Sequence, residues 1–320
     1  GVDYFDKYVP VVSWSTVRLM LCLSISKGWK TRQVDFCNAF VQAELKEDVY
    51  VSLPAMFSGP EGETNNEVVM KLNRSLYGLV QEPMYWYNHL QEYLEKVGFK
   101  CSKLDPCFFY GHGMVVLVYV DDCLFFGPDQ AKIDKQIKAL EDLGLTLTVE
   151  KDDAYAFLGV DVRPNGKGGY TMSQTGLINK VIKTTKMEDC NRKATPAANA
   201  PLGTDPEGKP YHEEWKYASV VGMLLYLSSN SRPDIQYAVH QCARFSHDPK
   251  LEHGQAVKRI GRCLKGTADK GLIMRPNRAQ SLGLCVYASF AGNWDNEVAA
   301  SDPSTAQYRH GCVLFHCGMP

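Results

Sequence analysis

The sequence lacks an uninterrupted apolar run long enough to cross a membrane. Its longest apolar stretch, residues 11–25, is broken by Ser, Thr and Arg, whereas a transmembrane helix needs about 20 predominantly apolar residues. No signal-peptide pattern opens the chain either. We therefore expect an intracellular, cytoplasmic protein that makes no membrane contact.

Regularly spaced cysteines are also lacking. The 11 cysteines include no Cys-x-x-Cys pair, which argues against a disulfide framework and favours free thiols in a reducing compartment. The tightest group of metal-binding side chains runs from His310 through Cys312 and His316 to Cys317, in a strand-like segment. Because a second spaced pair is missing, a zinc site is the weaker interpretation of this group.

A large charge of one sign is absent as well. The formal net charge is -1, so general attraction to nucleic acid is excluded and any such binding must rest on a local patch. Hydrophobic residues make up 45% and charged residues 22%, which excludes disorder as the explanation of the sequence. One segment does concentrate basic side chains: Lys258, Arg259, Arg262, Lys265, Lys270, Arg275 and Arg278. By itself this pattern favours a solvated helix face, with nucleic-acid binding as the alternative.

The most informative stretch is residues 114–127, in which two apolar, β-branched and aromatic runs flank Asp121 and Asp122. This pattern predicts a β-hairpin with both carboxylates at its tip. Adjacent carboxylates repel each other, and Mg²⁺, which binds one or two protein carboxylates, is the expected counterion. An ordinary Asp-containing turn remains open as the alternative.

Several further elements predict the fold class. Residues 31–40 read as a short strand ending near Asp35, a third carboxylate that could equally be a cap or turn residue. Helical periodicity covers residues 14–25, the segment after Pro83, and the segment after Asp129. Together with the hairpin they predict an α+β fold in which helices back an antiparallel sheet.

The second half of the sequence reads differently. Residues 191–210 are rich in Pro, Ala, Asn and Gly and predict a linker. Helical patterns follow at residues 215–228, 234–245 and 251–264, and two strand-like runs at residues 281–292 and 308–318 end the chain.

The sequence contains an ordered series of short motifs: Gln33-Val34-Asp35 with Ala39-Phe40, Ser75-Leu76-Tyr77-Gly78-Leu79 with Gln81, Asp105-Pro106-Cys107 with Phe109, Tyr119-Val120-Asp121-Asp122, Phe157-Leu158-Gly159, Arg232-Pro233-Asp234-Ile235 and Leu264-Lys265-Gly266-Thr267. In this order they resemble the reverse transcriptase of Ty1/copia-type retrotransposons, and the resemblance covers nearly the whole chain.

The resemblance implies a right-hand polymerase whose palm carries Asp35, Asp121 and Asp122 as catalytic metal ligands, with Asp122 the weaker one. Two Mg²⁺ ions would activate the primer 3′-hydroxyl and stabilise the leaving pyrophosphate. The implied substrates are an RNA template, a DNA primer and deoxynucleoside triphosphates, and an active element would work inside a retroelement particle.

The resemblance also implies roles for other residues. Phe40 would be a steric gate that excludes the 2′-hydroxyl of ribonucleotides, although a core Phe is the alternative. Gln81 would touch the incoming nucleotide or the template. The basic helix end would grip backbone phosphates without reading sequence; its residues are Lys258, Arg259, Arg262 and Lys265.

We expect four parts: a palm with partial fingers over residues 1–190, a linker over 191–210, a helical thumb-like domain over 211–278 and a truncated RNase H-like segment over 279–320. The basic fingers of the family lie upstream of this sequence, so we expect residues 1–320 to polymerise poorly. The strand at residues 285–292 has no carboxylate, so RNase H activity is not expected.

Two other functions compete with the polymerase. One is an inert retroelement remnant that at most binds nucleic acid through residues 258–278. The other is a different two-metal phosphoryl-transfer enzyme on a palm-like sheet, which would keep the three Asp residues but have no use for Phe40 or Gln81.

Overall fold

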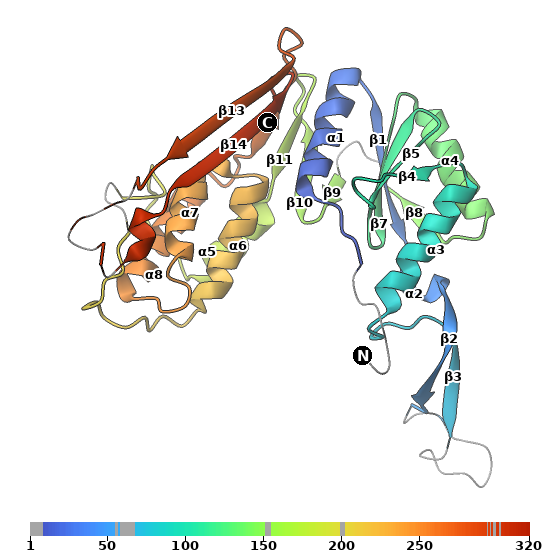
Figure 1. The fold of residues 1–320 in the computed structure, drawn as a ribbon, viewed down its shortest axis with the longest axis horizontal. Helices are drawn as coiled ribbons and strands as arrows, with labels where there is room; N and C mark the ends of the chain where they lie inside the picture. Colours follow the sequence, from blue (N-terminus) through green and yellow to red (C-terminus); the bar gives the residue numbers. More distant parts are fainter. Residues whose placement is uncertain are drawn as a thin grey trace. The chain divides into compact units, whose positions relative to one another are not determined.

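The computed structural model describes residues 9–54, 57, 68–150, 155–198, 202–292, 294, 296, 299–300 and 302–320. The chain divides into two compact units, residues 1–153 and 154–320 (Figure 1). Each unit combines helices with antiparallel sheets, in agreement with the mixed fold predicted from the sequence. Within the described residues, no helix is both long and apolar enough to span a bilayer.

The first unit is built on an antiparallel sheet. Its helices are α1 (Trp14–Lys27), α2 (Ala39–Gln42), α3 (Glu82–Lys96) and α4 (Gln130–Asp142). Its strands are β1 (Lys30–Phe36), β2 (Glu44–Ser52), β3 (Val69–Arg74), β4 (Lys100–Cys101), β5 (Phe108–Gly111), β6 (Met114–Tyr119), β7 (Asp122–Gly127) and β8 (Leu147–Val149). Six of these strands form one sheet in the order β4-β5-β6-β7-β1-β8, and β2 pairs with β3 separately.

Helices cover both faces of the six-stranded sheet (Figure 1). On β7, Cys123 and Phe125 belong to the core that includes residues of α3 and α4. The alternating side chains Leu124 and Phe126 are also buried, and α1 contacts β7. Because successive strand residues point to opposite faces, this double coverage explains why β6 and β7 are continuous apolar runs rather than alternating ones.

Local signals fix the helix ends where the sequence predicts them. The hydroxyl of Ser13 accepts a hydrogen bond from the amide of Thr16 at the start of α1, and Gly28 ends the helix with a left-handed φ of 68°. The carboxylate of Asp129 caps α4 by accepting from the amide of Ala131. Caps satisfy main-chain groups that a helix leaves unpaired, so these ends follow from short-range sequence alone.

The second unit contains a four-stranded sheet and a group of helices. Its helices are α5 (Thr175–Thr184), α6 (Tyr217–Asn230), α7 (Gln236–Ala243) and α8 (Leu251–Lys265), with 3₁₀ turns η1 (Pro233–Ile235) and η2 (Pro303–Ala306). Its strands are β9 (Tyr155–Phe157), β10 (Val160–Pro164), β11 (Tyr170–Ser173), β12 (Leu272–Met274), β13 (Leu282–Ser289) and β14 (Arg309–His316). The sheet order is β12-β11-β10-β9, and β13 pairs with β14 separately.

The division between the units falls earlier than the boundary expected at residue 190. Strand β11 pairs with β12, which follows α8, and α5 shares an apolar core with α6, α7 and α8. Residues 155–190 therefore belong with the helices of the second unit rather than with the first sheet. The described parts of the expected linker, residues 191–198 and 202–210, also lie within this unit. Sequence reasoning placed the boundary at the Pro- and Ala-rich segment because such composition marks any irregular chain, whether between units or inside one.

A buried arginine joins two of the sequence motifs in the second unit. Arg232 is 2% exposed and donates to both carboxylate oxygens of Asp234, at 2.8 and 2.7 Å. It also donates to the main-chain oxygen and the hydroxyl of Thr267, at 2.9 and 2.8 Å. The Arg-Pro-Asp-Ile and Leu-Lys-Gly-Thr motifs thus meet in a single network that ties η1 to the end of α8.

Candidate active site

The turn between β6 and β7 brings the three predicted carboxylates together. Val120 and Asp121 form the turn, and Asp122 is the first residue of β7. On the neighbouring strand, Asp35 lies directly opposite Asp122 in the antiparallel register. Opposed side chains on adjacent antiparallel strands have Cβ atoms about 4.5–5.5 Å apart. Residues separated by more than eighty positions in the sequence therefore share one small region of the sheet.

The alternation of β1 decides which way Asp35 points. Val34 and Phe36 lie in the core with α3 and α4, so Gln33 and Asp35 project from the opposite face. The side-chain amide of Gln33 donates to Oδ1 of Asp122 at 3.0 Å, which places Asp122 on that same face. Asp35, Asp121 and Asp122 are each partly exposed, so the carboxylates are accessible from solvent.

Two hydrogen bonds fix the main chain of the turn. The amide of Phe36 donates to the carbonyl of Asp121 at 2.9 Å, and the indole Nε1 of Trp86 donates to the carbonyl of Val120 at 2.6 Å. Val120 has a φ of 53°, a left-handed conformation that a β-branched residue rarely adopts. The turn is therefore held from β1 on one side and from α3 on the other.

Burial and mutual repulsion dominate the electrostatics of the carboxylates. Burial raises the pKa of Asp35 above its usual value, and the charges of Asp121 and Glu150 raise it further. Burial also raises the pKa of Asp122; the hydrogen bond from Gln33 opposes that shift, and the charges of Asp121 and Asp35 add to it. Like charges placed opposite each other destabilise a sheet, so the site favours either protons or an added cation.

The donor set suits a hard divalent cation, within a limit. Carboxylate oxygens are the ligands that Mg²⁺ prefers, and it commonly takes only one or two of them, filling the other positions with water and phosphate oxygens. Among the residues that the structure describes, no group of three or more His, Cys, Asp or Glu side chains is arranged to hold an ion. The site therefore fits a metal bound by two carboxylates at a time and completed by other oxygen ligands, rather than a closed protein cage.

The other predicted substrate residues lie on elements near the site in the first unit. Phe40 is on α2, partly buried against the core, and its ring meets that of Tyr77 edge-on with centroids 4.9 Å apart. Gln81 precedes α3; its carbonyl accepts from the amides of Met84 and Tyr85, and its side chain does not cap the helix. The side-chain amide of Gln81 is therefore not used to cap α3.

Sequence reasoning missed three residues of this site. Glu150 adds a fourth negative charge beside Asp35, Gln33 holds Asp122, and Trp86 holds the turn. Gln33 could have been found from its spacing, because it lies two residues before Asp35 and thus on the same strand face. Glu150 and Trp86 carry no such signal, since their approach depends on the pairing of β8 with β1 and on the docking of α3.

The predicted basic residues of α8 all have partners within the second unit. Lys258 pairs with Glu213 at 2.6 Å. The other three donate to neutral oxygens; these are Arg259 to the hydroxyl of Thr195 at 2.9 Å, Arg262 to the carbonyl of Asn191 at 2.6 Å, and Lys265 to the carbonyl of Cys190 at 3.0 Å. The four side chains are half-buried, and they fasten the segment after α5 onto α8. They are not a freely solvated face.

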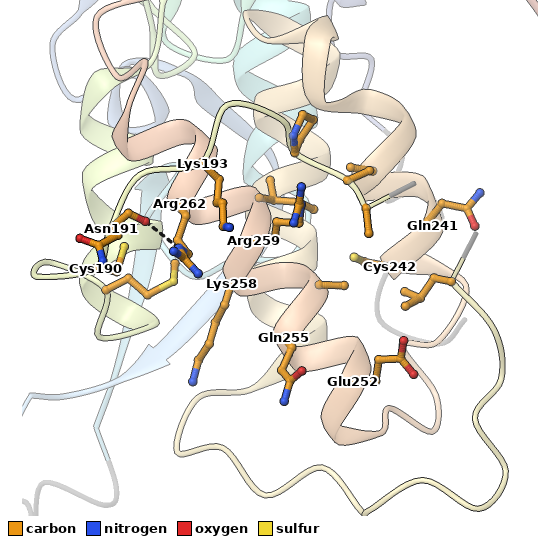
Figure 2. A pocket seen from close by; sticks show the side chains of 18 of the residues that line it. Cys190, Asn191, Lys193, Gln241, Cys242, Glu252, Gln255, Lys258, Arg259 and Arg262 are labelled. Atoms are coloured by element: carbon orange, nitrogen blue, oxygen red, sulfur yellow. Dashed lines mark hydrogen bonds between the residues drawn. The ribbon is translucent and has the colours of Figure 1, made fainter. Parts of the chain in front are cut away.

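This basic region borders a cleft of ≈ 860 Å³ in the second unit (Figure 2). The cleft lies between α7, α8 and the segment of residues 186–198, and Leu202 also lines it. Its cationic lining residues are Lys186, Lys193, Lys258, Arg259 and Arg262, and its anionic ones are Asp189 and Glu252. Figure 2 shows Arg262 turned toward Asn191, to which it is hydrogen-bonded. Lys186 and Lys258 are paired with Glu214 and Glu213. The other three cationic residues outnumber Asp189 and Glu252, so the cleft retains a small positive excess.

Carboxylates that can share divalent metal ions are typical of enzymes that transfer phosphoryl groups, such as polymerases and nucleases. Residues 1–199 match the family described as reverse transcriptase (RNA-dependent DNA polymerase). The chain belongs to this family, as its motifs predict.

Several relatives of the chain are Pol or Gag-Pol polyproteins of transposons. It is 34% identical over 306 residues to the retrovirus-related Pol polyprotein from transposon RE1 of Arabidopsis thaliana, which covers 94% of the chain and 20% of that polyprotein. It is 32% identical over 314 residues to the one from transposon TNT 1-94 of Nicotiana tabacum, covering 94% and 23% respectively. It is 24% identical over 296 residues to the transposon Ty1-H Gag-Pol polyprotein of Saccharomyces cerevisiae, covering 87% and 16%. The chain therefore spans about a fifth of the length of the first two relatives.

Proposed function

We propose that the protein is an RNA-directed DNA polymerase of a Ty1/copia-type retrotransposon and that its first sheet is the palm of a right-hand polymerase. The observation that carries the proposal is the register of β1 against β7, which sets Asp35 opposite Asp122 beside the Asp121 turn. Membership in the reverse transcriptase family supports the same function. Its substrates would be an RNA template, a DNA primer and deoxynucleoside triphosphates, handled inside the cell in a retroelement particle.

The carboxylates divide the work of holding the metal. Asp35 and Asp121 are the principal ligands, and Asp122 is the weaker one because its Oδ1 already accepts a hydrogen bond from Gln33. Bound Mg²⁺ supplies a Lewis acid that lowers the pKa of the primer 3′-hydroxyl and offsets the charge of the departing pyrophosphate. The carboxylates themselves position the metal ions and need not accept a proton.

The substrate residues then select and orient the nucleotide. Phe40, supported edge-on by Tyr77, lies under the sugar and leaves no space for a 2′-hydroxyl. Gln81, at the start of α3, offers an amide to the nucleotide or template. The helices of residues 211–278 serve as the thumb, and residues 279–320 begin an RNase H-like segment.

We assign the nucleic-acid backbone contacts to the basic end of α8. Arg259, Arg262 and Lys265 keep their charge while donating to neutral oxygens, so each can also attract a phosphate without reading sequence. Removing one phosphate contact should lower the dependence of log affinity on log salt by about one unit. Arg262→Gln should show this change in filter binding to an RNA–DNA duplex, and Lys180→Gln, at an exposed position on α5, should not.

Primer extension tests the proposed function directly. RNA-templated extension should require Mg²⁺ and should disappear with Asp121→Asn, measured both for residues 1–320 and for the longest reading frame that contains them. Nucleic-acid binding without extension in either protein would instead support the inert remnant.

A further inference from the structure

The backbone of the acidic turn has an unfavourable conformation. Val120 occupies the first of the two turn positions with a φ of 53°. In two-residue hairpin turns, the residue that has a positive φ at this position is usually Gly. A β-branched side chain there is a true outlier, and such conformations persist only where surrounding contacts hold them. The contacts that hold Val120 should therefore control the geometry of Asp121 and Asp122, which follow it directly.

Trp86 is the side chain placed to hold this conformation. It is 1% exposed on α3, and its ring meets Phe36 edge-on with centroids 5.2 Å apart. Its indole Nε1 donates to the carbonyl of Val120 at 2.6 Å. A buried indole N–H needs a partner, and here that partner is the main-chain oxygen of the strained residue itself.

The same tryptophan is coupled to the other fixed point of the turn. Phe36, which packs against Trp86, uses its amide to hold the carbonyl of Asp121 at 2.9 Å. It also follows Asp35 directly on β1. Trp86, Phe36 and the two turn residues thus form a closed set of contacts that links the position of Asp35 to those of Asp121 and Asp122.

We propose that Trp86 is a positioning residue whose indole N–H locks the Val120 turn and thereby holds Asp121 and Asp122 beside Asp35 for a divalent cation. The proposal deepens the proposed function and rests on it for the identity of the site. It does not require that the chain polymerises, because cation binding is itself the property that the lock controls. The ring of Trp86 fills the core, but only its N–H acts on the turn.

A double-mutant cycle at Trp86 and Val120 distinguishes the proposed lock from simple packing of the Trp86 ring. Trp86→Phe keeps an aromatic ring and removes the N–H, and Val120→Gly removes the backbone penalty because Gly adopts positive φ freely. With Mn²⁺ alone as the probe, followed by electron paramagnetic resonance on residues 1–320, Trp86→Phe should weaken Asp121-dependent Mn²⁺ binding about tenfold. In the Val120→Gly background the same change should weaken it by less than about threefold.

A matched control comes from the second unit. Trp215 is 6% exposed, and in the described part of the chain its indole nitrogen has no hydrogen-bond partner. Trp215→Phe therefore makes the same chemical change without breaking a lock, and it should leave Mn²⁺ affinity unchanged. A purely structural role for Trp86 predicts instead that Trp86→Phe weakens Mn²⁺ binding equally with Val120 and with Gly at position 120, which would overturn the proposal.

A second pair of variants carries the test if Trp86→Phe does not fold. Val120→Pro fixes φ near about −65° and should lose Mn²⁺ binding about tenfold or more, whereas Val120→Gly should keep it. Equal affinities in these two variants would refute control by the turn. Wild-type protein without any Asp121-dependent Mn²⁺ binding would refute it too, since the turn would then serve no cation.

The outcomes distinguish this proposal from the proposed function. If Mn²⁺ binds with the expected pattern but primers are not extended, the lock stands and the polymerase fails. If primers are extended but the effect of Trp86→Phe is the same in both backgrounds, the polymerase stands and the lock fails.

Discussion

The acidic and the basic regions of the molecule differ in how the surrounding residues compensate their charges. In the first unit, Asp35, Asp121 and Asp122 gather with Gln33 as a neutral hydrogen-bond partner, and burial and mutual repulsion raise the pKa of Asp35 and of Asp122. In the second unit, the basic residues of α8 reach carbonyl, hydroxyl and carboxylate oxygens of the adjoining segment.

The difference teaches which charges the fold needs and which it tolerates. The basic side chains stabilise their own unit by attaching the segment after α5 to α8, so they have a structural use without any ligand. The carboxylates oppose the folding of the sheet that carries them, because desolvated like charges cost free energy. Such a cost persists where function requires it, and this makes the acidic turn, rather than the larger cleft, the candidate catalytic centre.

The largest expected effect is on catalysis by the acidic turn. Asp35→Asn should lower RNA-templated primer extension about 10³-fold or more, because it removes the negative charge of a carboxylate that binds metal ions in the transition state. Asp122→Asn should reduce extension about tenfold less than Asp35→Asn does, because one carboxylate oxygen of Asp122 already accepts a hydrogen bond from Gln33. Single-turnover extension measures both. Equal losses for the two variants would contradict the assigned division of ligands.

Next in size is the effect of removing a buried cation from the second unit. Arg232→Gln should lower the free energy of unfolding by about 2–3 kcal/mol, because it removes charge-assisted hydrogen bonds to the exposed carboxylate of Asp234 and to the oxygens of Thr267. Arg262→Gln, half-buried and bound to a carbonyl, should cost about 1 kcal/mol. Urea unfolding compares them, and a larger loss for Arg262 would mean that the basic cleft is the main support of the unit.

The gate prediction tests whether the site beside the turn selects nucleotides. Phe40→Ala should improve ribonucleotide incorporation at least about tenfold relative to deoxynucleotides, because it opens space beneath the sugar. Deoxynucleotide incorporation serves as the internal control for folding. An unchanged ratio of the two specificity constants would leave Phe40 as a core residue packed on Tyr77.

The smallest expected effect is a pH dependence of stability. Burial and repulsion raise the pKa of Asp35 and of Asp122 above 3.8, so the folded state binds more protons than the unfolded state above that pH. The two carboxyl groups therefore contribute fully to stability below pH 3.8, and this contribution is lost as pH rises through their folded-state pKa values. Urea unfolding between about pH 4 and about pH 7 should show a shallower decline for Asp35→Asn than for the wild type. Adding Mg²⁺ should reduce the decline in the wild type alone.

Much of the first unit could be predicted from sequence because its signals are local. The cap at Asp129, the left-handed Gly28 and the apolar runs around Asp121 and Asp122 all act within a few residues. The grouping of Asp35 with the hairpin came instead from the family resemblance, since no local rule joins residues so far apart in the chain. Glu150, whose charge acts on Asp35, was missed for the same reason.

Two hairpins separate what the sequence determined from what tertiary structure decided. β6–β7 and β13–β14 are both apolar runs joined as antiparallel pairs, and β-propensity sufficed to predict that each run is a strand. β6 and β7 were predicted from continuous apolar runs, not from alternation, and they are buried by helices on both faces, whereas Leu284, Val286 and Tyr287 of β13 are exposed. Propensity is a property of neighbouring residues, but burial depends on what packs against a strand from elsewhere. The sequence therefore determined that both segments are strands, and only the tertiary structure decided that one of them buries its flanks and presents its carboxylates at a fixed turn.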